Sequence, residues 1–440
     1  MKQSKIILSA FIILLLIALP CIPAAAELPT IEITAENALV IDLDTDFVAY
    51  SKNPDEKVHP AGAVKIMTAI LAFEKTKDLT EKITADEKAY AGITSLSGAK
   101  IQKGEVVMLG DLLHALFLSS SNEAANVLAY YVSQDIDEFV KLMNEKAAEL
   151  GCVNTKFTNP TGVYDPEAFS TANDIALISR CMVQIKELYV ISGTYTYYIE
   201  PTNLNDKRRL LINGNQTDVQ TSAYYLRDIH GLKTSGVTVG GYSLISMGER
   251  KINRKPTKVL FILLGCPKGN TAAMANVYTD MKTLTSWFYE NFTLASLLSL
   301  NQPITEITVK LAQKKDSVVL STAKSLDVLV PSGFDEKNLV NTLDLPDYIL
   351  APVEKGQVVG TISVKYDNFE YGSVELVAAS SLTRDELLWY SYQINNFFSN
   401  IWVKLISGLF AASFIMYVSF SIYYNKQKKK RKSVKRRIKL

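Results

Sequence analysis

The segment that most constrains this chain is Leu405–Tyr424, twenty consecutive residues without a charge. At about 1.5 Å per residue, a helix of this length crosses the roughly 30 Å hydrocarbon core of a bilayer. A buried core helix fits less well, because the basic run Lys428–Lys432 follows closely. We therefore predict a transmembrane helix over 405–424. By the positive-inside rule its basic tail, residues 425–440, stays in the cytoplasm, and the body before it lies outside.

The amino terminus predicts export. Lys2 and Lys5 precede an apolar run, Ile6–Leu19, and three alanines close the segment at Ala26. This order is typical of a signal peptide, here residues 1–26, that is removed from the mature protein. Lipid attachment at Cys21 is a weaker alternative, because a proline directly precedes that cysteine.

Charge is distributed unevenly along the chain. The formal net charge of +2 comes from 47 Lys and Arg against 45 Asp and Glu. The first 26 residues carry +2 and residues 426–440 carry +10, which leaves 35 basic against 45 acidic residues between them. A nucleic-acid-binding domain needs a basic face, so the acidic body argues against that class. The hydrophobic content of 48% also excludes a disordered or collagen-like chain.

Three cysteines remain once the signal peptide is removed: Cys152, Cys181 and Cys266. Their spacing matches no metal-binding pattern, and three is an odd number for an oxidising compartment. One disulfide with a free thiol is one interpretation. We favour three small core residues.

Residues 30–292 predict an α+β domain. Short β-rich runs stand at both ends of this region, with helical patterns of three- and four-residue apolar spacing between them. This order favours an antiparallel sheet with helices packed around it. The predicted strands are 38–42, 47–50, 210–212, 243–246 and 259–263, and the predicted helices include 64–74, 109–131 and 136–150.

The pattern of apolar and polar residues changes after about residue 295. Alternating apolar and polar residues, as in Ile307–Leu311, predict a small all-β domain over 300–380. Residues 383–404 then predict an amphipathic stalk that leads into the membrane span.

Two segments in the first domain could carry chemistry. Lys65 lies among apolar residues near the start of a predicted helix, where burial would lower its pKa and make it a candidate general base. The plainer interpretation is a lysine that reaches the surface. Ser120 and Asn122 interrupt the next helical pattern. They either cap a helix or present a hydroxyl and an amide to a cleft.

The third segment contains Lys233, Thr234 and Ser235, just before a predicted strand. An ammonium beside a hydroxyl at a sheet edge is suited to binding a carboxylate. An ordinary exposed strand end is an equal alternative for this segment taken alone.

Together, in this order and spacing, the three segments resemble the low-molecular-mass penicillin-binding proteins, the D-alanyl-D-alanine carboxypeptidases. That family uses Ser-x-x-Lys, Ser-x-Asn and Lys-Thr-Gly. The similarity extends over about Ala38–Ala379, including the family-like stretches Leu150–Gly162, Phe169–Asp174 and Ile349–Gly360. It implies a β-lactamase/transpeptidase-like fold, a β-rich C-terminal domain, no metal or cofactor, and stem peptides ending in D-Ala-D-Ala as ligands.

The departures from that family matter as much as the match. Gly62 stands where the family has its nucleophilic serine, three residues before Lys65 and therefore on the same helix face. Glycine has no side chain, so no acyl-enzyme can form there. Ser235 replaces the glycine of the third motif, although Gly236 follows, and a one-residue shift could partly restore the room. His230 stands where the family often has an acidic residue.

Three hypotheses follow. We favour a pseudoenzyme, in which Lys233 and Thr234 hold the terminal carboxylate while Lys65, Ser120 and Asn122 persist as cleft residues. The alternative is a working carboxypeptidase by a changed route, with Ser120 as surrogate nucleophile or a water activated by Lys65. A membrane-anchored adhesion or structural protein without a working cleft is the third and least favoured.

Overall fold

The computed structural model describes residues 29–437 apart from 94–95, 237–240, 268–272 and 367–368. The predicted signal peptide lies outside these residues. The chain forms two compact units. The first contains residues up to Ala295 together with Val328–Glu336, and the second contains Ser296–Asp327 together with the chain from Lys337 onward.

A five-stranded antiparallel sheet forms the centre of the first unit, and it confirms the predicted α+β class. Its strands come from the two ends of this unit's sequence, as β1 (Asn37–Asp42), β2 (Val48–Lys52), β7 (Ile229–Gly236), β8 (Tyr242–Ile252) and β9 (Lys255–Cys266). The order is β2-β1-β9-β8-β7, so β7 lies at one edge. The predicted hairpin of β1 and β2 is present.

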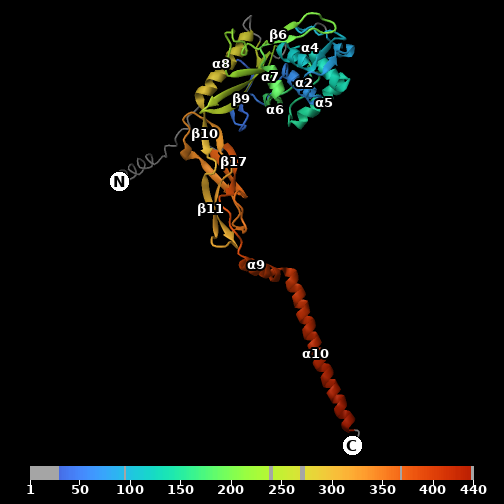
Figure 1. The fold of residues 1–440 in the computed structure, drawn as a ribbon, viewed down its shortest axis with the longest axis vertical. Coiled ribbons are helices and arrows are strands. Elements are labelled where there is room, and N and C mark those ends of the chain that lie inside the picture. Colours follow the sequence, from blue (N-terminus) through green and yellow to red (C-terminus); the bar gives the residue numbers. More distant parts are fainter. Residues whose placement is uncertain (1–28, 94–95, 237–240, 268–272, 367–368, 438–440) are drawn as a thin grey trace, which may run out of the picture. The chain divides into compact units, whose positions relative to one another are not determined.

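Helices cover both faces of this sheet (Figure 1). On one face, α2 (Ala63–Lys75), α6 (Ala172–Gln184) and α7 (Lys186–Ser192) contact the sheet. The same apolar core also contains α3 (Leu109–Leu118), α4 (Asn122–Ser133) and α5 (Ile136–Glu149). The other face packs against α8 (Ala273–Asn291). Successive side chains of a strand point to opposite faces, so a strand buried on both reads as a continuous apolar run. In β9, Leu260 and Ile262 join the first core, whereas Phe261 and Leu263 join the second.

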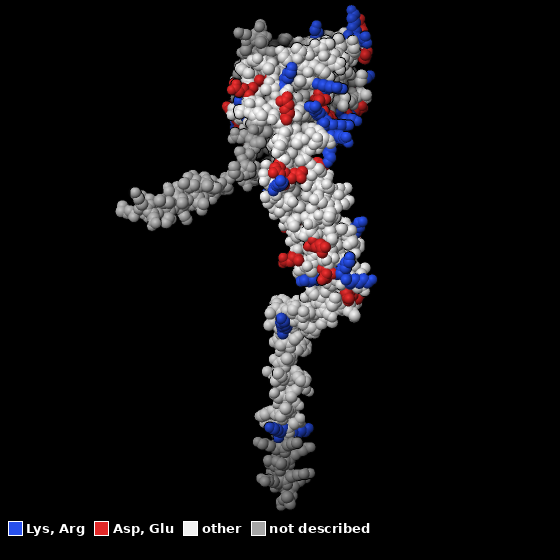
Figure 2. Space-filling model, turned by 90° about the vertical axis from the view of Figure 1, so that its left-hand side faces the viewer, with Lys and Arg blue, Asp and Glu red and all other residues white. Residues whose placement is uncertain are grey.

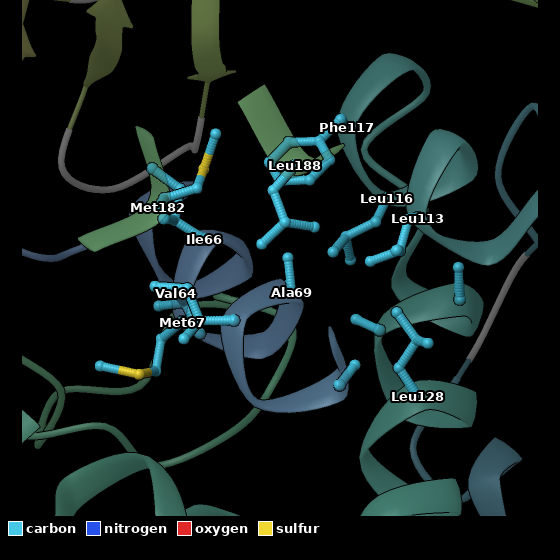
Figure 3. Packing of buried hydrophobic residues seen from close by; sticks show 14 of the residues in the cluster. Val64, Ile66, Met67, Ala69, Leu113, Leu116, Phe117, Leu128, Met182 and Leu188 are labelled. Atoms are coloured by element: carbon cyan, nitrogen blue, oxygen red, sulfur yellow. The ribbon is translucent and has the colours of Figure 1, made fainter. Parts of the chain in front are cut away.

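Helix α2 lies inside the larger core. Val64, Ile66, Met67 and Ala69 pack against apolar side chains of α3, α4, α6 and α7 (Figure 3). Truncating a buried residue such as Met67 to alanine costs about 2–5 kcal/mol in proteins generally. This packing fixes the first turn of α2, which carries Lys65, in an apolar environment.

The single helix predicted over 109–131 is wrong, because two helices, α3 and α4, occupy it. Ser119 Oγ donates to the carbonyl oxygen of Ala115 at 2.8 Å. Ser120 adopts a left-handed φ of 53°, and Ser121 then caps α4 by accepting from the N–H of Ala124 at 3.0 Å. Serine competes with helical hydrogen bonding in this way, which explains the break.

The strand predicted at 210–212 forms, but outside the central sheet. It is β6 (Arg209–Ile212), and it pairs only with β5 (Thr196–Ile199). Its expected burial is wrong on one face, since Leu210 and Ile212 are 44% and 53% exposed. The remaining short elements of this unit are β3 (Lys82–Thr84), which pairs with β4 (Val106–Met108), and the 3₁₀ turn η1 (Glu87–Tyr90).

The three cysteines Cys152, Cys181 and Cys266 are free. Cys152 and Cys266 are buried, and Cys181 is half-buried. Burial raises the pKa of the Cys152 thiol to about 12, which keeps it in the less reactive protonated form.

The second unit contains a six-stranded sheet in the order β14-β16-β17-β12-β11-β15. Every pair is antiparallel except β11 with β15. Its strands are β11 (Pro303–Lys310), β12 (Ser317–Thr322), β14 (Val340–Asp344), β15 (Ile349–Leu350), β16 (Val358–Tyr366) and β17 (Phe369–Ala378). β10 (Phe292–Leu298) pairs with β13 (Leu326–Pro331), and η2 (Glu336–Asn338) is a 3₁₀ turn.

Two helices end the chain, α9 (Glu386–Ser399) and α10 (Ile401–Arg437). Within the described residues, α10 contains one segment long and apolar enough to cross a membrane, Ile401–Lys428, with a mean hydropathy of 1.9. None of its apolar window is buried. Figure 2 shows blue atoms near the start of α10 and again just before its grey end, with none between them on the face in view. In the sequence, no Lys or Arg lies between Lys404 and Lys426.

Candidate functional site

A cleft of about 540 Å³ opens where the start of α2, the connection between α3 and α4, and strand β7 meet. All seven residues singled out in the sequence line it: Gly62, Lys65, Ser120, Asn122, Lys233, Thr234 and Ser235. They come from three segments that are far apart in the chain, and the fold brings them together.

Lys65 lies at the inner wall of the cleft and is only 4% exposed. Its Nζ donates to Asn122 Oδ1 at 2.8 Å and to the carbonyl oxygen of Thr161. Burial lowers the pKa of Lys65 to about 8, and the nearby charge of Glu123 partly opposes that shift. A substantial fraction of such a lysine is neutral just above neutral pH, so it can accept a proton.

Ser120 and Asn122 have separate local roles. Asn122 is the first residue of α4, from which its amide reaches Lys65. Ser120 lines the cleft with a left-handed backbone, a conformation that costs about 1–3 kcal/mol and often marks a functional site. The helix cap is the intervening Ser121.

Lys233 and Thr234 extend along β7 at the opposite wall. Lys233 is 4% exposed, and its Nζ donates to the carbonyl oxygens of Thr234 at 2.9 Å and Phe117 at 3.4 Å. Burial, with a further contribution from the charge of Lys65, lowers the pKa of Lys233 to about 7. The Thr234 hydroxyl lies 3.5 Å from the hydroxyl of Tyr278.

Gly62 and Ser235 are in direct contact. The N–H of Gly62 donates to Ser235 Oγ at 3.0 Å. A Cβ atom placed on Gly62 would lie 2.6 Å from Ser235 Cβ and 2.8 Å from Ser235 Oγ. The side chain that position 62 lacks is thus replaced in space by the side chain of Ser235.

Gly236 does not supply the room that a one-residue shift could have restored beside residue 235. In the sheet Ser235 pairs with Ser243 and Gly236 pairs with Tyr242. A Cβ on Gly236 would lie 2.2 Å from Tyr242 Cε1, so that glycine makes room for an aromatic ring of β8. Ser235 itself faces Gly62.

His230 does not line the cleft. Its Nδ1 lies 3.9 Å from Asp218 Oδ1. Asp218 accepts the N–H of Gly231 and the amide of Asn215. Burial raises the pKa of Asp218 to about 7.

Thr161 and Gly162 are site residues that motif reasoning left without a role. The Thr161 carbonyl accepts from Lys65, and Gly162 has a φ of 72°. A Cβ on Gly162 would lie 2.0 Å from the carbonyl oxygen of Ala61, so only glycine fits against this turn. Both belong to the family-like stretch Leu150–Gly162, but no side-chain pattern in the sequence marks a residue whose backbone carbonyl is the acceptor.

The electrostatics of the cleft favour an anion. Two lysines line it, and none of the described lining residues is acidic. Among the described residues, no group of three or more His, Cys, Asp or Glu is arranged to hold a metal ion. A carboxylate ligand would meet desolvated ammonium groups, where charge interactions are stronger than in water.

Comparisons with known proteins agree with this geometry. A family model described as D-alanyl-D-alanine carboxypeptidase matches residues 23–261, and one described as the C-terminal domain of penicillin-binding protein 5 matches residues 292–384. The chain is 29% identical over 339 residues to D-alanyl-D-alanine carboxypeptidase DacF of Bacillus subtilis, covering 76% of this chain and 82% of that protein. It is 26% identical over 386 residues to DacC of Escherichia coli, covering 86% and 88%.

Solved structures share the fold. Penicillin-binding protein 5 of Haemophilus influenzae superposes with a TM-score of 0.64 at 24% identity, over 81% of this chain and 99% of that one. A peptidoglycan synthesis regulatory factor of Streptococcus pneumoniae superposes with a TM-score of 0.67 at 20% identity, over 80% of this chain and 100% of that one. With more than half of its length matched by the family model, this chain belongs to the D-alanyl-D-alanine carboxypeptidase family and has that family's all-β C-terminal domain.

Proposed function

We propose that this protein binds peptidoglycan stem peptides ending in D-Ala-D-Ala at the outer face of the cytoplasmic membrane without forming an acyl-enzyme. Its relatives are D-alanyl-D-alanine carboxypeptidases. The observation that carries the proposal is Gly62, which leaves the cleft without a side chain at the start of α2 while the two buried lysines remain.

Binding of the peptide's terminal carboxylate is supported by Lys233 and Thr234. Both line the cleft, and the Lys233 ammonium is almost fully desolvated. A charge-assisted hydrogen bond in such a place is roughly twice as strong as a neutral one. When protonated, Lys65 adds a second positive charge to the same cleft, and no acidic side chain among the described lining residues competes for either ammonium.

Acylation is opposed at the atomic level. A serine-type peptidase forms an ester through a hydroxyl oxygen that a nearby base deprotonates. Lys65 and Asn122 remain in contact here, but Gly62 has no oxygen to offer the base. Loss of the nucleophile alone costs on the order of a million-fold in kcat in a serine protease.

Anchoring is supported by α10. Its segment Ile401–Lys428 is long and apolar enough to cross a membrane. We propose a single pass with the basic tail in the cytoplasm, because cationic residues next to a span are retained on that side. The two folded units would then lie where peptidoglycan is made and trimmed.

Peptide binding by the full chain in detergent micelles or nanodiscs tests the proposal. A stem pentapeptide ending in D-Ala-D-Ala should bind the wild type, and Lys233→Ala should weaken binding about tenfold or more. The matched control is Lys141→Ala on α5, whose side chain is 64% exposed and lies outside the cleft. A peptide with a C-terminal amide should bind wild type and Lys233→Ala equally weakly. Equal carboxylate binding by all three proteins would leave the cleft without this role and favour a structural or adhesive function.

The alternative is an active carboxypeptidase that uses Ser120 or a water activated by Lys65. It is favoured by the lowered pKa of Lys65, about 8, and by the position of Ser120 in the cleft. It predicts release of D-alanine by wild type that is lost on Lys65→Ala or Ser120→Ala. An absence of release, under conditions where an active relative turns over, would exclude it.

A further inference from the structure

The contact between Gly62 and Ser235 leaves no room for a side chain at position 62. A Cβ there would lie 2.6 Å from Ser235 Cβ, 2.8 Å from Ser235 Oγ and 3.2 Å from Lys233 Cγ. Real Cβ atoms essentially never lie within 3.0 Å of a heavy atom outside their own and the adjacent residues. Adding only a hydroxymethyl group at position 62 therefore cannot recreate a serine-type nucleophile in this cleft.

Neither backbone can readily move to relieve that contact. Gly62 is the N-cap of α2, whose next residues are almost fully buried. The turn before it has a left-handed Ala61, and the carbonyl of Ala61 packs against Gly162. On the other side, Ser235 is held in β7 by its pairing with Ser243.

The Ser235 hydroxyl also accepts the hydrogen bond of a backbone N–H that could otherwise bind a ligand. The N–H of Gly62 belongs to the first turn of α2, where backbone donors have no partner within the helix. Such donors stabilise negative charge that develops on a reacting carbonyl oxygen. Here the donor is taken by Ser235 Oγ at 3.0 Å.

We propose that Ser235 is a positioning residue that prevents acylation in this cleft. Gly62 and Ser235 then act as one coupled pair of replacements relative to the family motifs, the Gly62/Ser235 pair. The site becomes competent for acylation only when residue 62 gains a hydroxyl and residue 235 loses its whole side chain. This inference rests on the proposed function, in which position 62 is where the nucleophile is missing. It goes further, because it identifies Ser235, 173 residues away in sequence, as a second obstacle to acylation.

The reaction that reports on competence is acylation by a β-lactam. The hydroxyl oxygen introduced at position 62 forms an ester bond to the lactam carbonyl carbon, and the carbon–nitrogen bond of the ring breaks. Lys65 accepts the hydroxyl proton, which ends on the departing ring nitrogen. No oxidant, metal or further reactant takes part.

The test is a set of full-chain proteins in detergent, incubated with a fluorescent penicillin and followed by gel fluorescence and intact mass. The set is wild type, Gly62→Ser, Ser235→Gly, Gly62→Ser/Ser235→Gly and Gly62→Ser/Ser235→Ala. The last variant is the matched control, because alanine removes the hydroxyl of residue 235 but keeps its Cβ. A Cβ on residue 62 would lie 2.6 Å from that atom. Adding Lys65→Ala to Gly62→Ser/Ser235→Gly gives the negative control, because it removes the base that accepts the hydroxyl proton.

We expect Gly62→Ser/Ser235→Gly to be labelled about tenfold or more faster than Gly62→Ser and the alanine control. Wild type, Ser235→Gly and the variant with Lys65→Ala should carry no adduct. Peptide mapping should place the adduct at position 62. Labelling of Gly62→Ser at the same rate as the double variant would overturn the inference. So would an unlabelled double variant that still binds the stem peptide, since peptide binding shows that its cleft is folded.

An adduct on wild type that maps to Ser235 would also overturn the inference, because Ser235 would then be the nucleophile. Failure of the proposed function is distinguishable from these outcomes. It would show as an absence of peptide binding by wild type, whereas the labelling rates of the variants would still decide the role of Ser235.

Discussion

The N–H of Gly62, at the start of α2, donates to the Oγ of Ser235 on β7 at 3.0 Å. The two residues are complementary in volume: one has no side chain, and the other fills the space beside it. Each is a departure from the family motifs, and the structure shows that the two departures meet. The local geometry therefore tolerates both changes together better than either one alone.

Unfolding measurements should reveal this coupling. Gly62 has a helical φ of −67°, so Gly62→Ala adds a Cβ without backbone strain and isolates the steric contact. Overpacking should cost about 1–3 kcal/mol of unfolding free energy. Combining it with Ser235→Gly should cost clearly less than the sum of the single changes. Urea unfolding followed by tryptophan fluorescence gives the four free energies of unfolding, and strict additivity would contradict the contact.

The buried lysines should make stability rise with pH above neutrality. The pKa of Lys65 is about 8 and that of Lys233 is about 7, against 10.5 for a lysine in the unfolded chain. Between these values the unfolded state binds more protons, so the free energy of unfolding increases as pH rises from about 7 toward 10. Lys65→Met should flatten that rise in urea unfolding at pH 7, 8 and 9. An unchanged slope would argue that Lys65 is solvated.

Asp218 should have the opposite effect at lower pH. Its folded pKa of about 7 lies above the ordinary value of 3.8. The folded state therefore holds a proton that the unfolded state has lost, and this contribution to stability disappears as pH rises from about 4 through 7. Asp218→Asn should remove that decline. Because His230 Nδ1 lies 3.9 Å from Asp218, the same comparison should be made in a His230→Gln background, where the imidazole cannot contribute.

The sequence predicted the parts of the site that depend on local spacing. Lys65 lies in the first turn of its helix, near the predicted start. The polar interruption at Ser120 and Asn122 coincides with the break before α4, although a continuous helix was predicted over 109–131. Burial on both faces made the strand around Leu260 recognisable as a continuous apolar run. Such local patterns can be predicted from the sequence, because the spacing of residues on one face of a helix or strand is set by backbone geometry.

The sequence could not predict contacts that depend on tertiary packing. Gly62 and Ser235 are 173 residues apart, and nothing in the sequence links these two departures from the family motifs. The carbonyl of Thr161 is invisible to motif reasoning, because every residue has one. Asp218 is buried against β7, where it accepts from the amide of Asn215, and no sequence pattern marks either residue.

Membrane topology is testable with engineered cysteines. Ser433→Cys places a thiol in the basic tail, and Lys207→Cys places one on the exposed surface of the first unit. We expect an impermeant maleimide to label position 207 in right-side-out vesicles and position 433 only in inside-out vesicles. The native thiols require subtraction with unmodified protein. Labelling of both positions from the same side would contradict a single pass.

The central claim is that the cleft holds a stem peptide without cleaving it. The direct measurement is to incubate wild-type full chain with a pentapeptide ending in D-Ala-D-Ala, isolate the bound fraction and analyse peptide and protein by mass spectrometry. We expect the bound peptide to carry both D-alanines still and the protein mass to be unchanged. Bound peptide shortened by one D-alanine, or a protein carrying an acyl adduct, would contradict it.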